Sequence, residues 1–342
     1  MNSNQHELLT TVVGSYPVPD WLKSHHDPGV LNDAIALVMR AHERAGIDVI
    51  SDGEISRWDL RRGMVGGMVE RFVLSLSGIE PVLSRVQREQ FESRQETRYR
   101  RTAPGIVVDA IGEGSMDLTA EWRHLRSMTE RSLKFTITSP YMLAKVVADE
   151  FYGDIGKLAM AFADILAKQV AAIDADVLQI DEPHLPGHSD ESPLAANAIN
   201  HVLDAAGSAR SKAVHLCFGN YGGQTIQQGH YRQLIGFLND LHCDHVVLET
   251  TRRSDAETDQ LKEVKPEIQL GLGVIDVKDL QVESAEQVAR RVESFGNRFG
   301  VERIRYIHPD CGMQHLPRTV ADAKLLALVE GRDLAVGIQN NS

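Results

Sequence analysis

The sequence lacks most of the features that mark secreted, membrane-spanning or nucleic-acid-binding proteins. Its 342 residues include only three cysteines, too few for a disulfide framework. No apolar run approaches the roughly 18–20 residues needed to cross a bilayer. The start, MNSNQHELL, has neither the basic nor the apolar segment of a signal peptide. The net charge of −12 argues against a general nucleic-acid binder or a membrane-surface protein. We therefore expect a cytoplasmic protein whose reduced thiols are free to bind a metal or to react.

The sequence does contain a regular alternation of short apolar runs with helical patterns. Hydrophobic residues make up 42% and charged residues 25% of the chain, as in soluble globular proteins. Buried parallel strands that alternate with helices form βαβ units. Eight such units favour a closed (β/α)8 barrel of the TIM type over an open doubly wound sheet. The eight predicted strands lie within residues 10–17, 48–54, 134–140, 176–183, 213–220, 245–250, 270–276 and 303–312.

One interruption of this alternation lies between the second and the third predicted strand. Residues 105–114, GIVVDAIGEG, look strand-like but do not fit the alternation, and we interpret them as an inserted hairpin. Residues 85–101, RVQREQFESRQETRYRR, are unusually charged. They fit a solvated helical face, or alternatively a lid or docking surface for an anionic donor. Because no linker or low-complexity tract is evident, we predict that residues 1–342 form a single α/β domain.

Polar side chains gather at the predicted C-terminal ends of the strands, where the loops of such a barrel converge. His215 and Cys217 lie two apart in AVHLCFGN and therefore share one face of an extended strand. Glu249 ends the next strand, and Cys311 follows the last one. Together these side chains form a ligand set suited to tetrahedral Zn²⁺, although each alone also fits a half-buried strand or a helix N-cap. Cys243 precedes its strand, so we expect it at the opposite rim in a structural role.

Six short motifs occur in the order in which one known family carries them. VGSYP, SDGE, QIDEP, HLC, LET and HPDCGM extend over nearly the whole chain. Together they resemble the catalytic C-terminal barrel of cobalamin-independent methionine synthase and of its short single-barrel relatives. The resemblance implies a methyltransferase that converts homocysteine to methionine with zinc as cofactor. The zinc ligands that it implies are His215, Cys217, Glu249 and Cys311.

The resemblance also implies a site for the amino-acid part of homocysteine. The family holds the substrate ammonium with carboxylates that match Glu54 and Asp181, and the substrate carboxylate near a serine that matches Ser15. Two carboxylates in one pocket are costly unless a cation joins them, which a substrate ammonium would do. We therefore expect Glu54 and Asp181 to act in catalysis by holding the substrate. Its thiol, deprotonated on a metal site of net charge about −1, would stay nucleophilic and attack an electrophilic methyl group.

The sequence departs from the family pattern at the residues that concern the methyl donor. Full-length members carry a second, N-terminal barrel that helps to hold a folate polyglutamate, and this sequence shows no counterpart. The tryptophan that stacks on the pterin aligns with Val146. The histidine thought to assist protonation of the folate aligns with Lys278, a third candidate catalytic residue whose ordinary pKa near 10.4 suits that task poorly. A methylcorrinoid, free or carried on a partner protein, is therefore favoured over methyltetrahydrofolate.

Three alternatives remain open at this point. A related zinc enzyme could join coenzyme M to an epoxide. The sulfonate of that thiol would call for Arg57, Arg61 or Lys278, whereas Glu54 and Asp181 argue against it. A non-catalytic zinc-binding barrel could use all four ligands as a closed structural site, although structural zinc is more usual in small loop-rich modules. A zinc hydrolase would keep an open water position and fewer thiolates.

Overall fold

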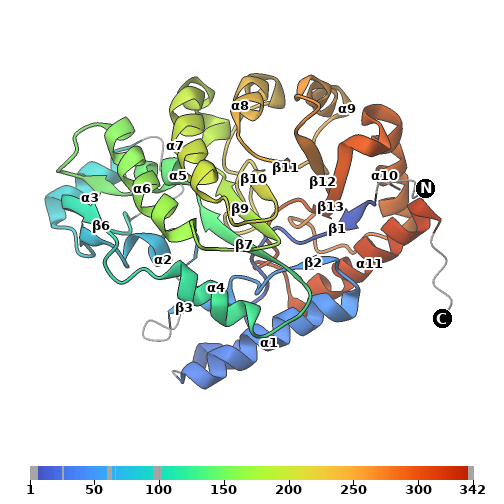
Figure 1. Ribbon diagram of the computed structural model, residues 1–342, viewed down its shortest axis with the longest axis horizontal. Coiled ribbons are helices and arrows are strands. Elements are labelled where there is room, and N and C mark those ends of the chain that lie inside the picture. The colour runs from blue at the N-terminus through green and yellow to red at the C-terminus, as the bar shows by residue number, and fades with distance from the viewer. Residues whose placement is uncertain are drawn as a thin grey trace.

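The predicted barrel is confirmed in the computed structural model, which describes residues 7–24, 27–59, 64–65, 67–94, 100 and 102–337. Eight strands form one parallel sheet in the order β1-β13-β12-β11-β10-β9-β7-β2, with helices around it (Figure 1). A parallel bridge between Thr11 and Val49 joins the two end strands, so the sheet closes on itself. Each predicted apolar run overlaps one strand. The strands are β1 (Leu9–Thr10), β2 (Val49–Ile50), β7 (Ser132–Thr138), β9 (Val177–Glu182), β10 (Lys212–Leu216), β11 (His245–Leu248), β12 (Gln269–Ile275) and β13 (Ile304–Pro309).

The helices between the strands begin and end at residues with clear capping roles. The Asp27 side chain accepts a hydrogen bond from the amide of Gly29 at the start of α1, which ends at Gly46 with φ of 83°. Ser284 and Gln287 form a capping box at the start of α10. No helix in the described part of the chain is long and apolar enough to cross a membrane. The main helices are α1 (Pro28–Ala45), α4 (Leu118–Arg126), α5 (Pro140–Val146), α6 (Ile155–Val170), α7 (Ser192–Ala205), α8 (Ile235–Asp240), α9 (Asp255–Thr258), α10 (Ala285–Phe299) and α11 (Arg318–Val336).

The insertion lies between the second and third barrel strands, as predicted, but it is larger than a local hairpin. Residues 105–114 supply one strand, β6 (Ile106–Gly112), which pairs antiparallel with β5 (Ser77–Glu80) and parallel with β8 (Ala148–Asp149). The strand β5 could not be predicted, because its residues are half-buried or exposed and show no apolar alternation. The insertion also holds β3 (Trp58–Asp59), β4 (Met64–Val65), α2 (Glu70–Val73) and α3 (Arg85–Glu92).

Part of the charged segment 85–101 is the helix α3, which the Ser84 capping box starts and which turns mostly exposed side chains to solvent. This part fits the solvated helical face. Residues 95–99 and 101 lie outside the described residues.

The interior of the barrel changes from apolar to polar along the strands. Val49, Val177, Ala213, Val247 and Tyr306 belong to one buried apolar cluster. Side chains two residues apart share a face of a strand. The inward positions that follow are therefore polar, namely Gln179 and Asp181 on β9 and His215 and Cys217 on and just after β10.

The seam between β1 and β2 is closed mainly by side chains. The backbone amide and Oγ1 of Thr10 donate to Oδ2 of Asp48 over 2.7 and 2.8 Å. Oγ1 of Thr11 donates to the carbonyl of Val49 over 2.9 Å. From α11, Nη1 of Arg332 lies 2.7 Å from Oδ2 of Asp48. The seam therefore depends on a small polar network rather than on a long ladder of backbone hydrogen bonds.

Candidate metal and amino-acid site

A cavity of about 120 Å³ lies at the C-terminal ends of the strands. A larger pocket of about 450 Å³, lined largely by α9 and α10, contains none of the predicted site residues. Two predicted residues, Glu249 and Lys278, do not line the smaller cavity. The other six do line it, and the structure therefore brings together Ser15, Glu54, Asp181, His215, Cys217 and Cys311.

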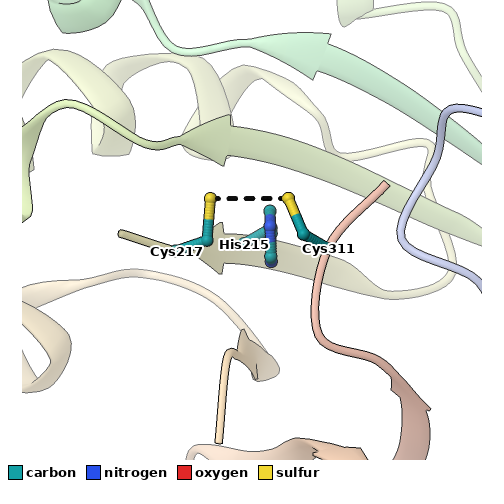
Figure 2. Close-up of side chains that lie close together, drawn as sticks. All are labelled: His215, Cys217 and Cys311. Carbon is teal, nitrogen blue, oxygen red and sulfur yellow. Dashed lines mark hydrogen bonds between the residues drawn. The ribbon is translucent and has the colours of Figure 1, made fainter. Parts of the chain in front are cut away.

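His215, Cys217 and Cys311 form one side of this cavity, which we call the sulfur wall. Figure 2 shows the two sulfur atoms facing each other beside the imidazole. The three potential ligand atoms lie within 4.8 Å of one another, and the sulfur atoms are 3.7 Å apart as free thiols. Nδ1 of His215 lies 2.9 Å from the carbonyl oxygen of Val247, which can only accept, so the proton is assigned to Nδ1. Nε2 is buried, and although burial opposes the charge of the imidazole, its interaction with the sulfur of Cys311 raises the pKa of His215. This donor set and tautomer fit a zinc ion.

The electrostatic environment favours a thiolate at Cys311. Its pKa lies well below the ordinary value because Cys217 is hydrogen-bonded to its sulfur and because His215 and Lys278 are close. The pKa of Cys217 is raised, since the same hydrogen bond and burial favour its thiol form. Metal binding requires both sulfur atoms as thiolates, so it would release the remaining proton.

Glu249 and Lys278 form a buried ion pair beside the sulfur wall. Nζ of Lys278 lies 2.7 Å from Oε1 of Glu249, and the two side chains are only 2% and 1% exposed. Oε2 of Glu249 accepts a hydrogen bond from the amide of Phe218 over 3.1 Å. Burial opposes the charge of Lys278, but Glu249 raises its pKa above the ordinary value. The structure thus places Glu249 against Lys278 and outside the three-residue ligand group.

Cys243 immediately precedes Asp244 and β11, at the N-terminal end of the barrel. Its side chain is buried in the hydrophobic core. Burial raises its thiol pKa to about 12, so the thiol stays protonated. This placement agrees with the expectation that Cys243 lies at the N-terminal rim, opposite the candidate site.

Glu54 and Asp181 form a second side of the cavity, which we call the carboxylate wall. Nη1 of Arg57 lies 3.0 Å from Oε2 of Glu54, and Oγ1 of Thr136 donates to Oε1 over 3.1 Å. A Cβ atom on Gly14 would lie 2.3 Å from Oε1, so glycine is required beside this carboxylate. Burial raises the pKa of Glu54 to about 7 despite the opposing charge of Arg57.

Asp181 is held by its neighbour on the same strand. Nε2 of Gln179 donates to Oδ1 of Asp181 over 2.7 Å. Burial raises the pKa of Asp181, while His215 and Arg57 oppose this shift. Both carboxyl groups of the wall therefore resist ionisation, and a cation in the cavity would favour their charged forms.

Ser15 lies next to the segment that follows Cys311. The amide of Met313 donates to the carbonyl of Ser15 over 2.7 Å, and a Cβ atom on Gly312 would collide with Oγ of Ser15. This contact fixes the loop after β1 against the sulfur wall.

Several supporting residues were not expected from the sequence. The sequence suggests Arg57 only as a sulfonate ligand, whereas the structure pairs it with Glu54. Lys134 lies outside the six motifs, and Gln179 begins the motif QIDEP but has no assigned role there. A signal was present, because Lys134 and Thr136, and likewise Gln179 and Asp181, are two apart in predicted strands and share an inward face.

Comparisons with known proteins identify the family of the chain. Residues 8–332 match the family described as cobalamin-independent synthase, catalytic domain. The chain is 30% identical over 348 residues to a methionine synthase of Thermococcus kodakarensis, which covers 96% of this chain and 93% of that protein. It is 31% identical over 343 residues to a methionine synthase of Sulfurisphaera tokodaii, which covers 95% of this chain and 91% of that protein.

A solved structure shows the same fold. The structure of a B12-independent methionine synthase from Shewanella sp. W3-18-1 in complex with selenomethionine matches with a TM-score of 0.79 at 24% identity. The match covers 96% of this chain and 98% of that one. The chain therefore belongs to the cobalamin-independent methionine synthase family and is a methyltransferase.

Proposed function

We propose that this methyltransferase transfers a methyl group to the sulfur of homocysteine in a zinc-dependent reaction that gives methionine. One observation carries the proposal: a His-Cys-Cys ligand group and two buried carboxyl groups line the same cavity of about 120 Å³. Homocysteine offers a thiol to the first group and an ammonium to the second. The relatives named methionine synthase support the same substrate.

His215, Cys217 and Cys311 would hold the zinc, with Glu249 as the expected fourth ligand. When bound, zinc supplies a Lewis acid that lowers the pKa of a substrate thiol and leaves its sulfur nucleophilic near neutral pH. The chain contributes the orientation of the imidazole, which Val247 fixes through Nδ1. The two cysteines contribute negative charge, which keeps the bound sulfur electron-rich.

The carboxylate wall would hold the other end of the substrate. Oδ1 of Asp181 already accepts from Gln179, so Oδ2 is the oxygen that a substrate ammonium would meet first. Glu54 lines the same cavity, and its pKa of about 7 means that a cation would draw it into the ionised form. Ser15 lines the same cavity and would bind the substrate carboxylate. These residues would orient the thiol toward the sulfur wall.

The methyl donor that we favour is a methylcorrinoid, as substrate rather than resident cofactor. Val146, at the position of the pterin-stacking tryptophan, is fully buried and offers no stacking surface. Lys278, at the position of the folate-protonating histidine, is paired with Glu249 and has a raised pKa, so it is a poor proton donor near neutral pH. Both observations count against methyltetrahydrofolate.

A coenzyme M alkyltransferase is disfavoured by the same contacts. Its thiol carries a sulfonate, which needs a cation with no other partner. Arg57 is bound to Glu54, and Lys278 is bound to Glu249. Arg61 lies outside the described residues.

The decisive experiment incubates the zinc-loaded protein with homocysteine and either methylcobalamin or methyltetrahydrofolate, and measures methionine by mass spectrometry. We expect methionine from methylcobalamin, less or none from methyltetrahydrofolate, and none after zinc is removed with a chelator. A parallel reaction contains coenzyme M in place of homocysteine. Alkylation of coenzyme M without formation of methionine would contradict the proposal.

A further inference from the structure

A buried chain of hydrogen bonds leads from the barrel interior to Asp181. Nζ of Lys134 on β7 donates to Oε1 of Gln179 on β9 over 2.7 Å. Nε2 of Gln179 then donates to Oδ1 of Asp181 over 2.7 Å. Lys134 is 1% exposed and Gln179 is fully buried. None of the reactions considered above uses either side chain as a substrate contact.

The same two side chains also hold the segment that follows β1. Nζ of Lys134 donates to the carbonyl of Val12 over 2.7 Å, and Nε2 of Gln179 donates to the carbonyl of Val13 over 2.9 Å. Val13 lines the cavity and stands two residues before Ser15. One lysine and one amide therefore connect the segment that leads to Ser15 with the carboxylate of Asp181.

Lys134, Asp181 and Val13 together determine which way the Gln179 amide faces. A protonated lysine can only donate hydrogen bonds and a carbonyl can only accept them, so the amide turns its oxygen toward Nζ and its NH₂ group toward Asp181 and Val13. In the reversed orientation, the amide oxygen would face a carboxylate and a carbonyl, and the NH₂ group would face the ammonium of Lys134. Acceptors would then face acceptors, and donors would face donors. Without Lys134, the amide oxygen loses its donor, and only Asp181 and Val13 orient the amide.

We propose that Lys134 and Gln179 are positioning residues for the amino-acid end of the substrate, because they set Asp181 and the Ser15 loop in a fixed relation to each other. This inference rests on the proposed function, in which Asp181 binds the substrate ammonium and Ser15 binds the carboxylate. It assigns the preference for an amino-acid thiol in part to two residues that do not touch the substrate.

The environment of Lys134 agrees with this role. Burial lowers its pKa to about 7, while the charge of Asp181 opposes the shift. His245 and His308 also lie within its electrostatic reach, and both have lowered pKa values because of burial. Protonated or neutral, Nζ carries enough hydrogens to donate to both Gln179 and Val12, so the arrangement does not depend on titration.

The test compares homocysteine with 3-mercaptopropionate, a thiol that is one carbon shorter and has a carboxylate but no ammonium. Binding of homocysteine and of 3-mercaptopropionate to the zinc-loaded full chain is measured by calorimetry, for the wild type, Lys134→Met, Gln179→Met and the double variant. The double variant removes both ends of the hydrogen bond between Lys134 and Gln179, so neither of these side chains is left unpaired. The carbonyls of Val12 and Val13 lose their donors, so the melting temperature of each variant is measured as a check on folding. Lys324→Met is the matched control. Lys324 is another fully buried lysine, but it pairs with Glu283 over 2.8 Å at a distant helix.

We expect Gln179→Met to weaken homocysteine roughly tenfold, the size of one lost neutral hydrogen bond at a binding group. Binding of 3-mercaptopropionate, which keeps a carboxylate but has no ammonium, should weaken less, and the zinc content should stay at the wild-type value. Lys134→Met should lose less, because Gln179 can still donate to Asp181 and to the carbonyl of Val13. The double variant should match Gln179→Met rather than the sum of the two, since the residues act in series. Lys324→Met should keep the full preference for homocysteine.

Two results would overturn the inference. One is a double variant that keeps the wild-type preference for homocysteine. The other is an equal weakening of both thiols, which would indicate general damage to the barrel. A wild type that itself shows no preference would instead contradict the proposed ammonium site, and the inference with it.

Discussion

The two walls of the cavity satisfy their polar atoms in opposite ways. In the sulfur wall, the three potential ligand atoms lie within 4.8 Å of one another, and the side chains of His215 and Cys217 interact with the sulfur of Cys311. In the carboxylate wall, both oxygens of Glu54 and one oxygen of Asp181 are already held by Arg57, Thr136 and Gln179. The sulfur wall would therefore depend on a bound metal ion to satisfy its ligand atoms, whereas other protein side chains already satisfy most of the oxygen atoms of the carboxylate wall.

This difference predicts how each wall responds to substitution. A change in the sulfur wall removes a ligand and leaves the rest of the protein undisturbed. A change in the carboxylate wall alters a balance of buried charges that includes Arg57. Metal content should therefore report on the first wall, and substrate selectivity and stability on the second.

The largest effect is expected from Cys217→Ser or Cys311→Ser. A serine hydroxyl stays protonated and binds zinc poorly, so zinc affinity should fall more than about 100-fold and methyl transfer should stop. Zinc per chain is measured by mass spectrometry, and X-ray absorption of the wild type should show Zn–S distances near 2.3 Å. Cys243→Ser is the control and should keep its zinc. Loss of zinc in that variant would place the metal elsewhere.

Asp181→Asn should weaken homocysteine roughly 30-fold to several thousandfold, because it removes one charge of a desolvated pair. The affinity for 3-mercaptopropionate and the zinc content should not change. Glu54→Gln should show the same loss of selectivity and, in addition, a lower melting temperature. It leaves the buried guanidinium of Arg57 unpaired, at a cost of about 3–5 kcal/mol. Unchanged selectivity in both variants would mean that the carboxylate wall does not bind the substrate ammonium.

Glu249→Gln should lower zinc affinity about 10- to 100-fold, less than either cysteine change, because Glu249 stands outside the three-residue ligand group. Lys278→Met is the companion variant. It frees Oε1 of Glu249, so zinc affinity should be equal to or higher than that of the wild type. Both are measured by competition with a chromophoric chelator. A loss in Glu249→Gln as large as in Cys217→Ser would make Glu249 a full member of the sulfur wall.

The smallest effect concerns His42, which resembles His215 but has no cysteine beside it. Nδ1 of His42 lies 3.1 Å from the carbonyl of Ser51, and Nε2 is buried without a recorded partner among the described residues. Burial lowers its pKa to about 4. Between about pH 6.5 and 4 the unfolded chain binds a proton that the folded chain does not, so stability falls as the pH falls. The loss should be roughly 1 kcal/mol from about pH 7 to about pH 5.5.

His42→Gln should flatten this part of the pH dependence, since glutamine can still donate to the carbonyl of Ser51. The measurement is urea unfolding at several pH values. An unchanged slope in the variant would assign the acid sensitivity to other groups.

Much of the barrel and of the sulfur wall could be predicted from the sequence because both depend on local spacing. Alternating apolar runs predict strands, and two residues such as His215 and Cys217 at one strand end must point the same way. The strand β5 was missed because it is held by pairing with β6 and has no apolar pattern of its own.

The supporting contacts of the site could not be predicted in the same way. The Glu249 and Lys278 pair joins residues 29 apart, and the Lys134 and Gln179 contact joins residues 45 apart. Such contacts depend on which strands become neighbours and in what register. Alternation shows that these side chains face inward, but it does not show which of them meet.

The seam between β1 and β2 lies beside the amino-acid site. Ser15 follows β1 and Glu54 follows β2, so a substrate that binds both residues would link the two strands. At this seam a single bridge, between Thr11 and Val49, takes the place of a ladder of backbone hydrogen bonds. In the free protein, amide hydrogens near residues 9–15 and 48–54 should exchange with solvent faster than those of β9 and β10. An amino acid bound across the seam would slow that exchange, because a ligand that binds only the closed form stabilises it. Substrate binding would then stabilise the closed barrel at this seam.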